Sequence, residues 1–175
     1  MIQLIDLGLP SETLWADRNI GADTPEQAGD YFRFGETTPF TEDSPQYIYD
    51  DIEENIAGTG KDAATVILDN NYRMPTLDQI KELLKECKWE WTDLNGVKGM
   101  KVTGPNGNSI FFPASGFRYN GNKTPNYVGS YGYCWSASAN DINYGHILYF
   151  YSSYWYWYCY ISRAFGFPVR AVQQK

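Results

Sequence analysis

Hydrophobic and polar positions alternate with a period of two along most of this chain, which is typical of strands with one buried face. Asn-Gly pairs at residues 95–96 and 106–107 punctuate this pattern and favour tight hairpin turns. The alternation predicts strands at residues 2–7, 14–20, 89–91, 99–103, 109–112, 133–138, 145–151, 155–161 and 166–172.

The period changes to 3.6 over residues 77–87, where Leu77, Ile80 and Leu83 form an apolar stripe behind Thr76, a predicted N-cap. Shorter helices are predicted at residues 62–68 and from Thr24, and residues 36–60 are predicted to form a long surface loop. The expected class is α+β, with mostly antiparallel strands, two or three helices and much loop. No domain boundary is visible, so residues 1–175 are expected to form one domain.

Residues 125–172, which we call the aromatic stretch, have an unusual composition. Residues 143–161 alone hold seven tyrosines, two tryptophans, one phenylalanine and the only histidine. The whole stretch contains no lysine, glutamate, glutamine or methionine, whereas residues 1–124 contain 23 of these. Because solvated surfaces are normally rich in lysine and glutamate, the restriction points to a special role for this stretch.

Two interpretations of the tyrosines remain open. On a strand, Tyr154, Tyr156, Tyr158 and Tyr160 share one face, and Trp155, Trp157, Cys159 and Ile161 share the other. The tyrosines are then either the ordinary exterior of a packed strand or a patch of the kind that marks interaction surfaces. Tyrosine gives contact area at low entropic cost together with a hydroxyl, so the pattern favours a binding surface.

Charge argues against several classes of partner. The net charge is −7, and Asp141 is the only acidic residue after position 124. An acidic chain without a basic patch is not expected to bind nucleic acid. The acidic run at residues 50–54 lacks the ligand spacing of a calcium loop, which favours a solvated face, and no metal or other cofactor is expected.

The motifs of common enzymes are missing, and we expect no enzymatic activity. HExxH, GxSxG, P-loop and GxGxxG motifs are absent, and His146 stands without a marked nucleophile or orienting carboxylate. Cys87, Cys134 and Cys159 form neither an even framework nor a CxxC pair, which favours isolated thiols. No apolar run is long enough to cross a bilayer, and residues 1–10 lack the pattern of a signal peptide. Production without export and removal of a leader both fit this beginning.

The genetic code offers a reason for the restricted composition. The residues that fill the stretch, such as Asn, Asp, His, Tyr, Ser and Cys, all have codons that end in a pyrimidine. They result when an asparagine codon is randomised at its first two bases, a route that cannot reach Lys, Glu, Gln, Met or Trp. The missing residue types therefore indicate randomised codons, with the tryptophans at fixed positions or derived from other template codons.

The chain resembles the variable proteins of diversity-generating retroelements of gut bacteria and their phages. The resemblance rests on IDLGLPSETLWADRNIGA, GDYFRFGETTP, YRMPTLDQIKELL, VTGPNGNSIFFPASGFR and GSYGYCWSAS…RAFGFPVRAV, which span nearly the whole chain. It implies a C-type lectin-like fold, shared distantly with formylglycine-generating enzymes, in which residues 1–124 are a scaffold and residues 125–172 a diversified binding region. Calcium-dependent sugar-binding motifs are absent, so lectin activity is not carried over.

The resemblance also implies individual roles. The expected framework positions include Trp135, Ser136, Leu148, Phe150, Arg163, Gly166 and Arg170. The expected ligand-binding positions are Tyr131, Tyr133, Asn143, Tyr144, His146, Ile147, Tyr149, Tyr151, Tyr154, Tyr156, Tyr158, Cys159, Tyr160, Ile161, Ser162 and Phe165.

The function expected from these observations is non-enzymatic display of a tyrosine-rich surface that binds a protein or glycan on a target cell. Such a protein belongs on a phage virion or a bacterial cell surface, without insertion into the membrane, and oligomers occur among proteins of this type. Two alternatives remain: a constant carbohydrate-binding or adhesin module, and an oxidase related to formylglycine-generating enzymes that uses a cysteine such as Cys159.

Overall fold

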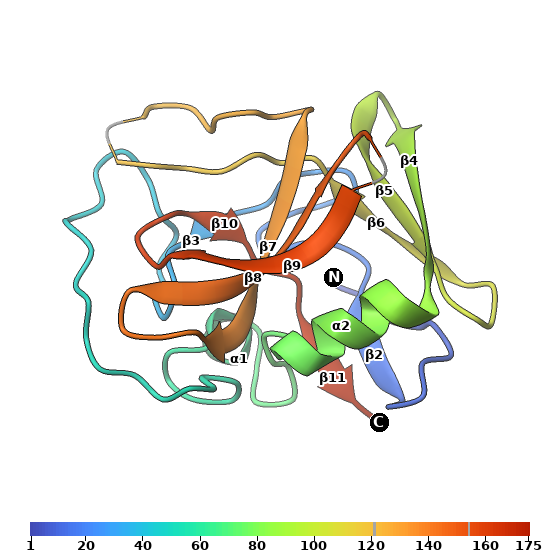
Figure 1. Ribbon diagram of the computed structural model, residues 1–175, viewed down its shortest axis with the longest axis horizontal. Helices are drawn as coiled ribbons and strands as arrows, with labels where there is room; N and C mark the ends of the chain where they lie inside the picture. Colours follow the sequence, from blue (N-terminus) through green and yellow to red (C-terminus); the bar gives the residue numbers. More distant parts are fainter. Residues whose placement is uncertain (121, 154) are drawn as a thin grey trace.

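The computed structural model describes residues 1–120, 122–153 and 155–175, with the backbone alone for residues 155–157. Within that part the chain forms eleven strands and two helices (Figure 1). In chain order they are β1 Leu4–Asp6, β2 Thr13–Ala16, β3 Tyr31–Phe32, α1 Ala63–Ile67, α2 Leu77–Glu86, β4 Lys88–Leu94, β5 Val97–Thr103, β6 Ser109–Pro113, β7 Tyr131–Ala139, β8 Tyr144–Tyr151, β9 Trp155–Ser162, β10 Phe167–Pro168 and β11 Val172–Gln174.

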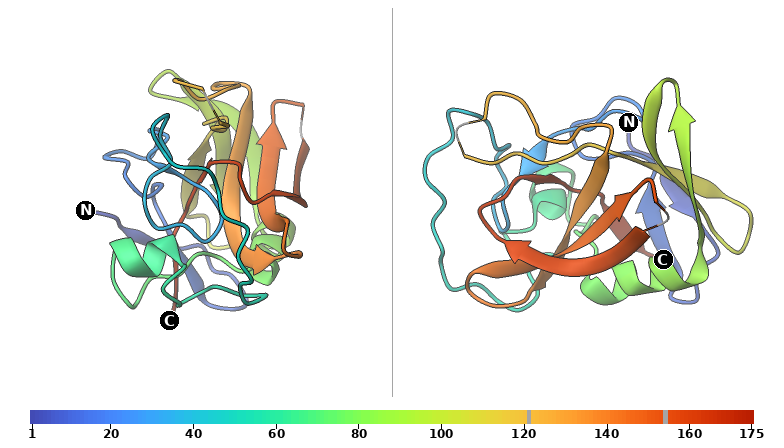
Figure 2. Two further views of the ribbon diagram at one scale, coloured as in Figure 1. Left: turned by 90° about the vertical axis from the view of Figure 1, so that its left-hand side faces the viewer. Right: turned by 45° about the horizontal axis from the view of Figure 1, so that its top comes forward.

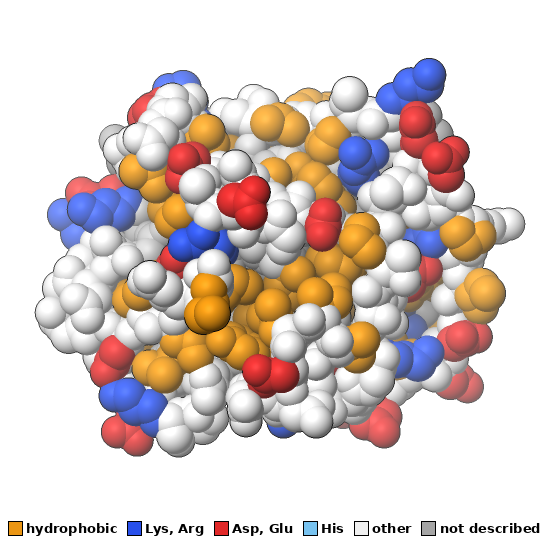
Figure 3. All heavy atoms as spheres, turned by 180° about the vertical axis from the view of Figure 1, so that it is seen from behind, with side chains coloured by type: hydrophobic (Ala, Val, Ile, Leu, Met, Phe, Trp, Pro, Cys, Tyr) orange, Lys and Arg blue, Asp and Glu red, His pale blue; other side chains and the backbone are white. Residues whose placement is uncertain are grey.

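The strands form four small sheets, β1-β2-β11, β3-β10, β4-β5-β6 and β7-β8-β9, and every pairing is antiparallel. The mostly antiparallel α+β class expected from the sequence is confirmed. The sheet that carries the aromatic stretch lies on the side of the molecule away from the N-terminus (Figure 2). Seen from behind, hydrophobic side chains also gather near the middle of the opposite face, with charged side chains around them (Figure 3).

Both ends of the chain meet in the β1-β2-β11 sheet. Trp15 of β2 lies opposite Ile5 on one side and Val172 on the other, and its side chain is completely buried. The predicted strand at residues 14–20 ends early, at Ala16. At this point the carbonyl oxygen of Ala16 accepts a hydrogen bond from the guanidinium of Arg170 (3.1 Å).

The two predicted helices at residues 62–68 and 77–87 are confirmed. Asp62 caps α1, and its buried carboxylate accepts hydrogen bonds from four backbone N–H groups. Thr76 caps α2 in a capping box with Gln79, as the sequence predicts. The helix predicted from Thr24 is wrong, because a single turn closes there through the N–H of Gln27 and no second turn follows.

The predicted loop at residues 36–60 is confirmed as irregular backbone, but part of it is interior. Phe40 and Tyr47 are buried, and the guanidinium of Arg33 lies 4.4 Å from the ring centroid of Phe40. That buried guanidinium also forms an ion pair with Glu36 at 2.7 Å. The acidic run at residues 50–54 is exposed at its four carboxylates, in agreement with a solvated face.

The tight hairpin turn predicted at residues 95–96 is confirmed between β4 and β5. Asn95 and Gly96 both have positive φ angles, 50° and 83°, which is the conformation of a tight primed turn. The seven-residue strands on either side pair without a register shift.

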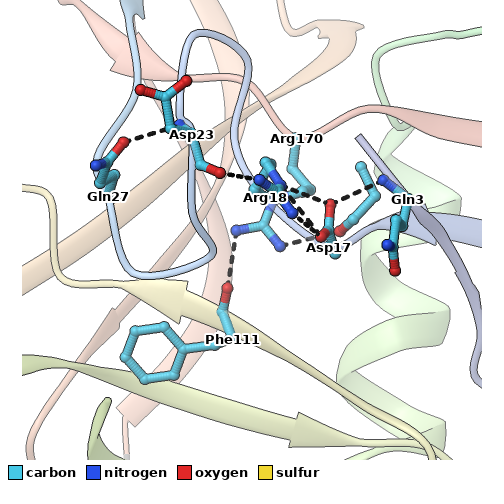
Figure 4. Close-up of polar contacts among 8 residues, drawn as sticks. Gln3, Asp17, Arg18, Asp23, Gln27, Phe111 and Arg170 are labelled. Atoms are coloured by element: carbon cyan, nitrogen blue, oxygen red, sulfur yellow. Dashed lines mark hydrogen bonds and ion pairs between the residues drawn. The ribbon is translucent and has the colours of Figure 1, made fainter. Parts of the chain in front are cut away.

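The segment at residues 166–172 was predicted to be one strand and is two. β10 pairs with β3 and β11 pairs with β2, so the chain crosses from one sheet to another between them. Arg170, in the interval, turns its side chain inward and donates a hydrogen bond to the carbonyl oxygen of Phe111 (Figure 4). It also donates to Oδ1 of Asn19 and to the carbonyl oxygen of Ala16. Burial lowers the pKa of this guanidinium to about 10, which still leaves it protonated at neutral pH.

The core consists of two hydrophobic clusters on opposite faces of β8. Leu148 and Phe150 belong to the cluster with Trp89 and Phe112, whereas Ile147 belongs to the cluster with Phe34 and Trp135. β8 is therefore covered on both sides, and the aromatic stretch is bound into the core of the scaffold.

Candidate ligand-binding surface

The register of the β7-β8-β9 sheet divides the candidate residues between its two faces, because residues directly opposite each other share a face. Tyr133 lies opposite Tyr149, and His146 lies opposite Tyr160. We call the two sides the Tyr149 face and the Tyr160 face. The Tyr149 face carries Tyr131, Tyr133, Ile147, Tyr149, Tyr151, Cys159 and Ile161, and the Tyr160 face carries Tyr144, His146, Tyr158, Tyr160 and Ser162.

The tyrosine rings of the Tyr149 face form a continuous aromatic surface. The ring centroid of Tyr149 lies 5.0 Å from that of Tyr133, 5.9 Å from that of Tyr131 and 5.7 Å from that of Tyr151. Ring pairs at these separations stabilise one another beyond their buried area, by about 0.5–1.5 kcal/mol each. The surface is therefore preorganised rather than a set of independent side chains.

Burial affects the hydroxyls of this face. It raises the pKa of Tyr149 to about 12 and also raises the pKa of Tyr133, with the neighbouring tyrosines adding to the effect. Both phenols are thus neutral at physiological pH. A hydrogen bond joins the two side chains, so the pair forms an uncharged polar site in which one hydroxyl hydrogen is already used.

Phe117, Tyr119 and Tyr127 extend this aromatic surface beyond the predicted set. Phe117 contacts Tyr133 and Tyr127 at centroid distances of 5.7 and 5.8 Å, and Phe165 contacts Tyr119 at 4.8 Å. Tyr119 and Tyr127 are 46% and 60% exposed. The sequence did not indicate them, because isolated bridges from Phe117 to Asn126 and from Arg118 to Gly166 bring them beside the sheet.

A groove of about 300 Å³ borders the Tyr149 face. Tyr131 and Tyr151 form one wall, and Trp91 and Lys98 from the β4-β5 hairpin form another. Backbone and hydroxyl groups of residues 129, 130 and 152 complete it. An aromatic wall beside a few polar groups suits the ring and hydroxyls of a sugar as well as a protein side chain.

The Tyr160 face is more exposed and lies beside α2. Tyr144, Tyr158 and Tyr160 are 40%, 45% and 58% exposed. The ring of Tyr160 packs edge-on against Tyr144, with centroids 5.7 Å apart, and Nζ of Lys81 lies 4.8 Å from the ring centroid of Tyr158. The predicted alternation along β9 is confirmed where side chains are described, since these tyrosines point outward while Cys159 and Ile161 are half-buried.

His146 has the environment of a surface residue at the edge of the core. Burial and the nearby charge of Lys81 lower its pKa, and its ring packs edge-on against Tyr160 at 6.3 Å.

The described residues contain no group of three or more His, Cys, Asp or Glu side chains that could hold a metal ion. Burial also raises the pKa of the Cys87 and Cys134 thiols to about 11, which keeps both protonated and weakly nucleophilic.

Burial separates the candidate positions from the expected framework positions. All seven framework residues named above are buried. Of the fourteen candidate residues whose side chains are described, thirteen have solvent-accessible surface. Ile147 is the exception, because it has no exposed surface and can shape the Tyr149 face only from beneath. Tyr154 and the side chain of Tyr156 lie outside the described residues.

The remaining candidates sit at the ends of the strands. Asn143 is exposed in the turn before β8, and Phe165 stacks on Phe167 after β9, with centroids 6.0 Å apart. Ser162, at the end of β9, contacts the hydroxyl of Tyr49 at 3.0 Å. The candidate residues therefore surround the sheet and do not converge on a single pocket.

Comparison with known proteins gives one family match. A family model described as a domain of unknown function (DUF8237) matches residues 79–172, which covers 94 of the 175 residues and the whole aromatic stretch. Neither the curated proteins nor the solved structures give a match. No helix in the described part of the chain is long and apolar enough to cross a membrane.

Proposed function

The chain belongs to the DUF8237 family, and we propose that it is a non-enzymatic display protein whose aromatic stretch binds a protein or glycan target. On this proposal it is a variable protein of a diversity-generating retroelement with a C-type lectin-like fold. It acts on a phage virion or a bacterial cell surface, in attachment to a target cell.

The observation that carries the proposal is the difference in burial between two sets of neighbouring residues. Leu148 and Phe150 alternate along β8 with Tyr149 and Tyr151, and the first pair is buried while the second has exposed surface. A strand with this pattern keeps its buried core when the partly exposed positions are substituted, and the loss is limited to the ring contacts that those positions make, about 0.5–1.5 kcal/mol each. That tolerance is what a diversified binding surface requires.

A second function, a constant carbohydrate-binding module, is favoured by the groove beside Tyr131 and Tyr151. Its aromatic walls and its neutral polar groups are of the kind that stack on and hydrogen-bond to sugars. For the oxidase alternative, burial and a raised pKa argue against Cys134 as the reactive thiolate and leave the half-buried Cys159 as the candidate. Copper-dependent oxidase activity in the parent that is lost in Cys159→Ser would revive it.

Binding to panels of proteins and glycans, with paired variants, tests the proposal. Tyr144→Ala with Tyr160→Ala removes exposed rings from one face, and Tyr131→Ala with Tyr151→Ala removes them from the other. Ile48→Ala is the matched control, because Ile48 is 71% exposed and lies in the loop at residues 36–60. We expect a loss of binding of at least tenfold in one paired variant, while unfolding stays cooperative and the melting temperature falls only by the lost ring contacts, about 2–4 °C per kcal/mol. A collapse of melting with no ligand on either panel would support plain packing.

The surrounding DNA provides an independent test of diversification. We expect a near-identical template copy of the codons for residues 125–172, differing at template adenines and adjacent to a gene for a reverse transcriptase. A single glycan class bound by every natural variant would instead favour the constant carbohydrate-binding module.

A further inference from the structure

The two outer strands of the β7-β8-β9 sheet differ in how their free edges are covered. On the β7 side, loops close the edge with backbone hydrogen bonds: Ala137 donates to Pro75 and accepts from Ile56, and Ala139 donates to Glu54, at 2.7–2.9 Å. Gly116 donates to the carbonyl oxygen of Tyr131 at 2.8 Å at the other end of β7. This edge is therefore covered by the scaffold at both of its ends.

The β9 side has no such cover over Tyr158, Tyr160 and Ile161. In the part of the chain that the structure describes, no loop or strand other than β8 is seen to donate or accept a backbone hydrogen bond at these three residues. β9 pairs with β8 alone, through eight consecutive residue pairs without a register shift. In an antiparallel pair every second residue directs its N–H and C=O away from its partner. The hydrogen bond from the Arg163 N–H to Asn143 sets the phase, so Ile161 bonds toward β8, whereas Tyr158 and Tyr160 present their N–H and C=O outward.

The sequence of β9 also lacks the usual protection of an edge strand. Natural edge strands are short, bulged, or carry lysine, other charges or proline, which discourage pairing with another chain. β9 is eight residues long, WYWYCYIS, and contains no charged residue, no proline and no bulge. Such an edge is an open template for one more strand.

We propose that the outer edge of β9 is a strand-addition site, where an extended segment of a polypeptide target pairs with the backbone of β9. The occupant is identified by chemistry, because only a peptide backbone repeats N–H and C=O groups at the spacing of a strand. A glycan cannot match that row of alternating donors and acceptors. The inference rests on the proposed function and narrows its target from protein or glycan to protein.

The edge is also a physically suitable site for a surface whose side chains change. Backbone N–H and C=O groups are the same whatever side chain the codon specifies, so they supply affinity that substitution does not remove. The side chains then supply specificity on two sides of the added strand, through the exposed Tyr158 and Tyr160 on one and the half-buried Ile161 on the other. Proline in the bound segment is disfavoured where its missing N–H faces β9.

Panning of a library of random linear peptides, about 12 residues long, against the intact chain provides the probe. Recovered peptides are synthesised with one backbone nitrogen methylated at a time, and the affinity of each is measured by calorimetry. We expect methylation to weaken binding by about tenfold or more at every second position and by little at the positions between, since a lost hydrogen bond of about 1.4 kcal/mol is a tenfold change. Amide exchange of the free and peptide-bound chain is followed by NMR, and alternate residues of β9 should become protected.

Several outcomes would overturn the inference, and they distinguish it from the proposed function. Two results would remove strand addition and leave the display proposal intact. One is a methylation series in which every position has a similar effect. The other is loss of peptide binding in Tyr131→Ala with Tyr151→Ala, together with amide exchange in β9 that the peptide does not change. A glycan ligand with no peptide recovered would do the same. Sedimentation of the chain as a dimer that Tyr160→Lys dissociates would assign the edge to a second copy. Absence of peptide, protein and glycan ligands together would reject both proposals.

Discussion

Gly132 gives the sharpest test of how the aromatic stretch is built into the scaffold. It lies in β7 directly opposite Phe150 of β8, and a Cβ at this position would be 1.8 Å from Cζ and 2.1 Å from Cε2 of that ring. Carbon atoms in contact normally lie about 3.5–4.0 Å apart, so Gly132→Ala requires the ring to move by about 2 Å. Phe150 is fully buried between Trp89 and Phe112, each 6.3 Å away by centroid, and has little room to move.

The expected cost follows from this geometry. Overpacking of a well-packed core typically costs about 1–3 kcal/mol. For a domain of this size, each kcal/mol shifts the melting temperature by about 2–4 °C, so we expect Gly132→Ala to melt about 2–12 °C below the parent. Differential scanning calorimetry measures the shift.

Two further variants make the test specific. Gly60→Ala is the matched control, because a methyl group added at Gly60 would have no other atom within 4 Å and the residue has no positive φ, so we expect no loss of stability. In the background of Phe150→Leu, which removes the colliding ring atoms, Gly132→Ala should cost at least 0.5 kcal/mol less, within the usual range of about 0.5–3 kcal/mol for residues in contact. Equal melting of Gly132→Ala and Gly60→Ala, or strict additivity in the double variant, would refute the reasoning.

Three further predictions concern stability. Asp62→Ala should lower the free energy of unfolding by about 3 kcal/mol or more in urea, because it leaves buried N–H groups without an acceptor and removes a helix cap; an effect below about 1 kcal/mol would contradict this. Arg170→Met should cost about 2–4 kcal/mol in the same assay, since the carbonyls of Ala16 and Phe111 lose their donor, whereas Lys175→Met, which breaks an exposed ion pair, should cost less than about 1 kcal/mol. Burial raises the pKa of Tyr31 to about 12, above its unfolded value near 10. The stabilisation from the neutral hydroxyl is therefore complete below pH 10, and up to about 2.7 kcal/mol of the free energy of unfolding is lost as the pH rises to 12. Urea unfolding between pH 9 and 12 should show that decline in the parent and a flatter profile in Tyr31→Phe, and parallel profiles would argue against it.

Local chemistry was sufficient to predict the elements with strong signals of their own. The capping residue Thr76 and the apolar stripe behind it located α2, and the Asn95-Gly96 pair located a hairpin, because both depend on interactions within a few residues. The helix expected from Thr24 does not form, because a cap and a proline can start a turn but do not supply the apolar face that stabilises a helix.

The arrangement of the candidate site depends on the register between neighbouring strands, which the sequence of one strand does not reveal. Alternation along β9 correctly separated Tyr158 and Tyr160 from Ile161, yet it gave no information on how β7 and β8 pair beside it. The pairing places Tyr133 and Tyr149 on the side opposite to Tyr160, so the tyrosines form two surfaces where the sequence suggested one. The burial of Ile147 and the contribution of scaffold aromatics likewise arise from contacts between distant segments.

The position of β11 has a consequence for synthesis of the protein on the ribosome. β2 emerges long before its partner residues 172–174, so Trp15 has no partner in β11 until Val172 has been synthesised. The buried Trp15 therefore has no complete environment until the segment that contains Val172 has emerged, and pairing over such a separation is slow. During that interval β9 has already been synthesised. The nascent chain therefore passes through a stage in which this uncharged, aromatic strand is exposed while the β1-β2-β11 sheet is still incomplete.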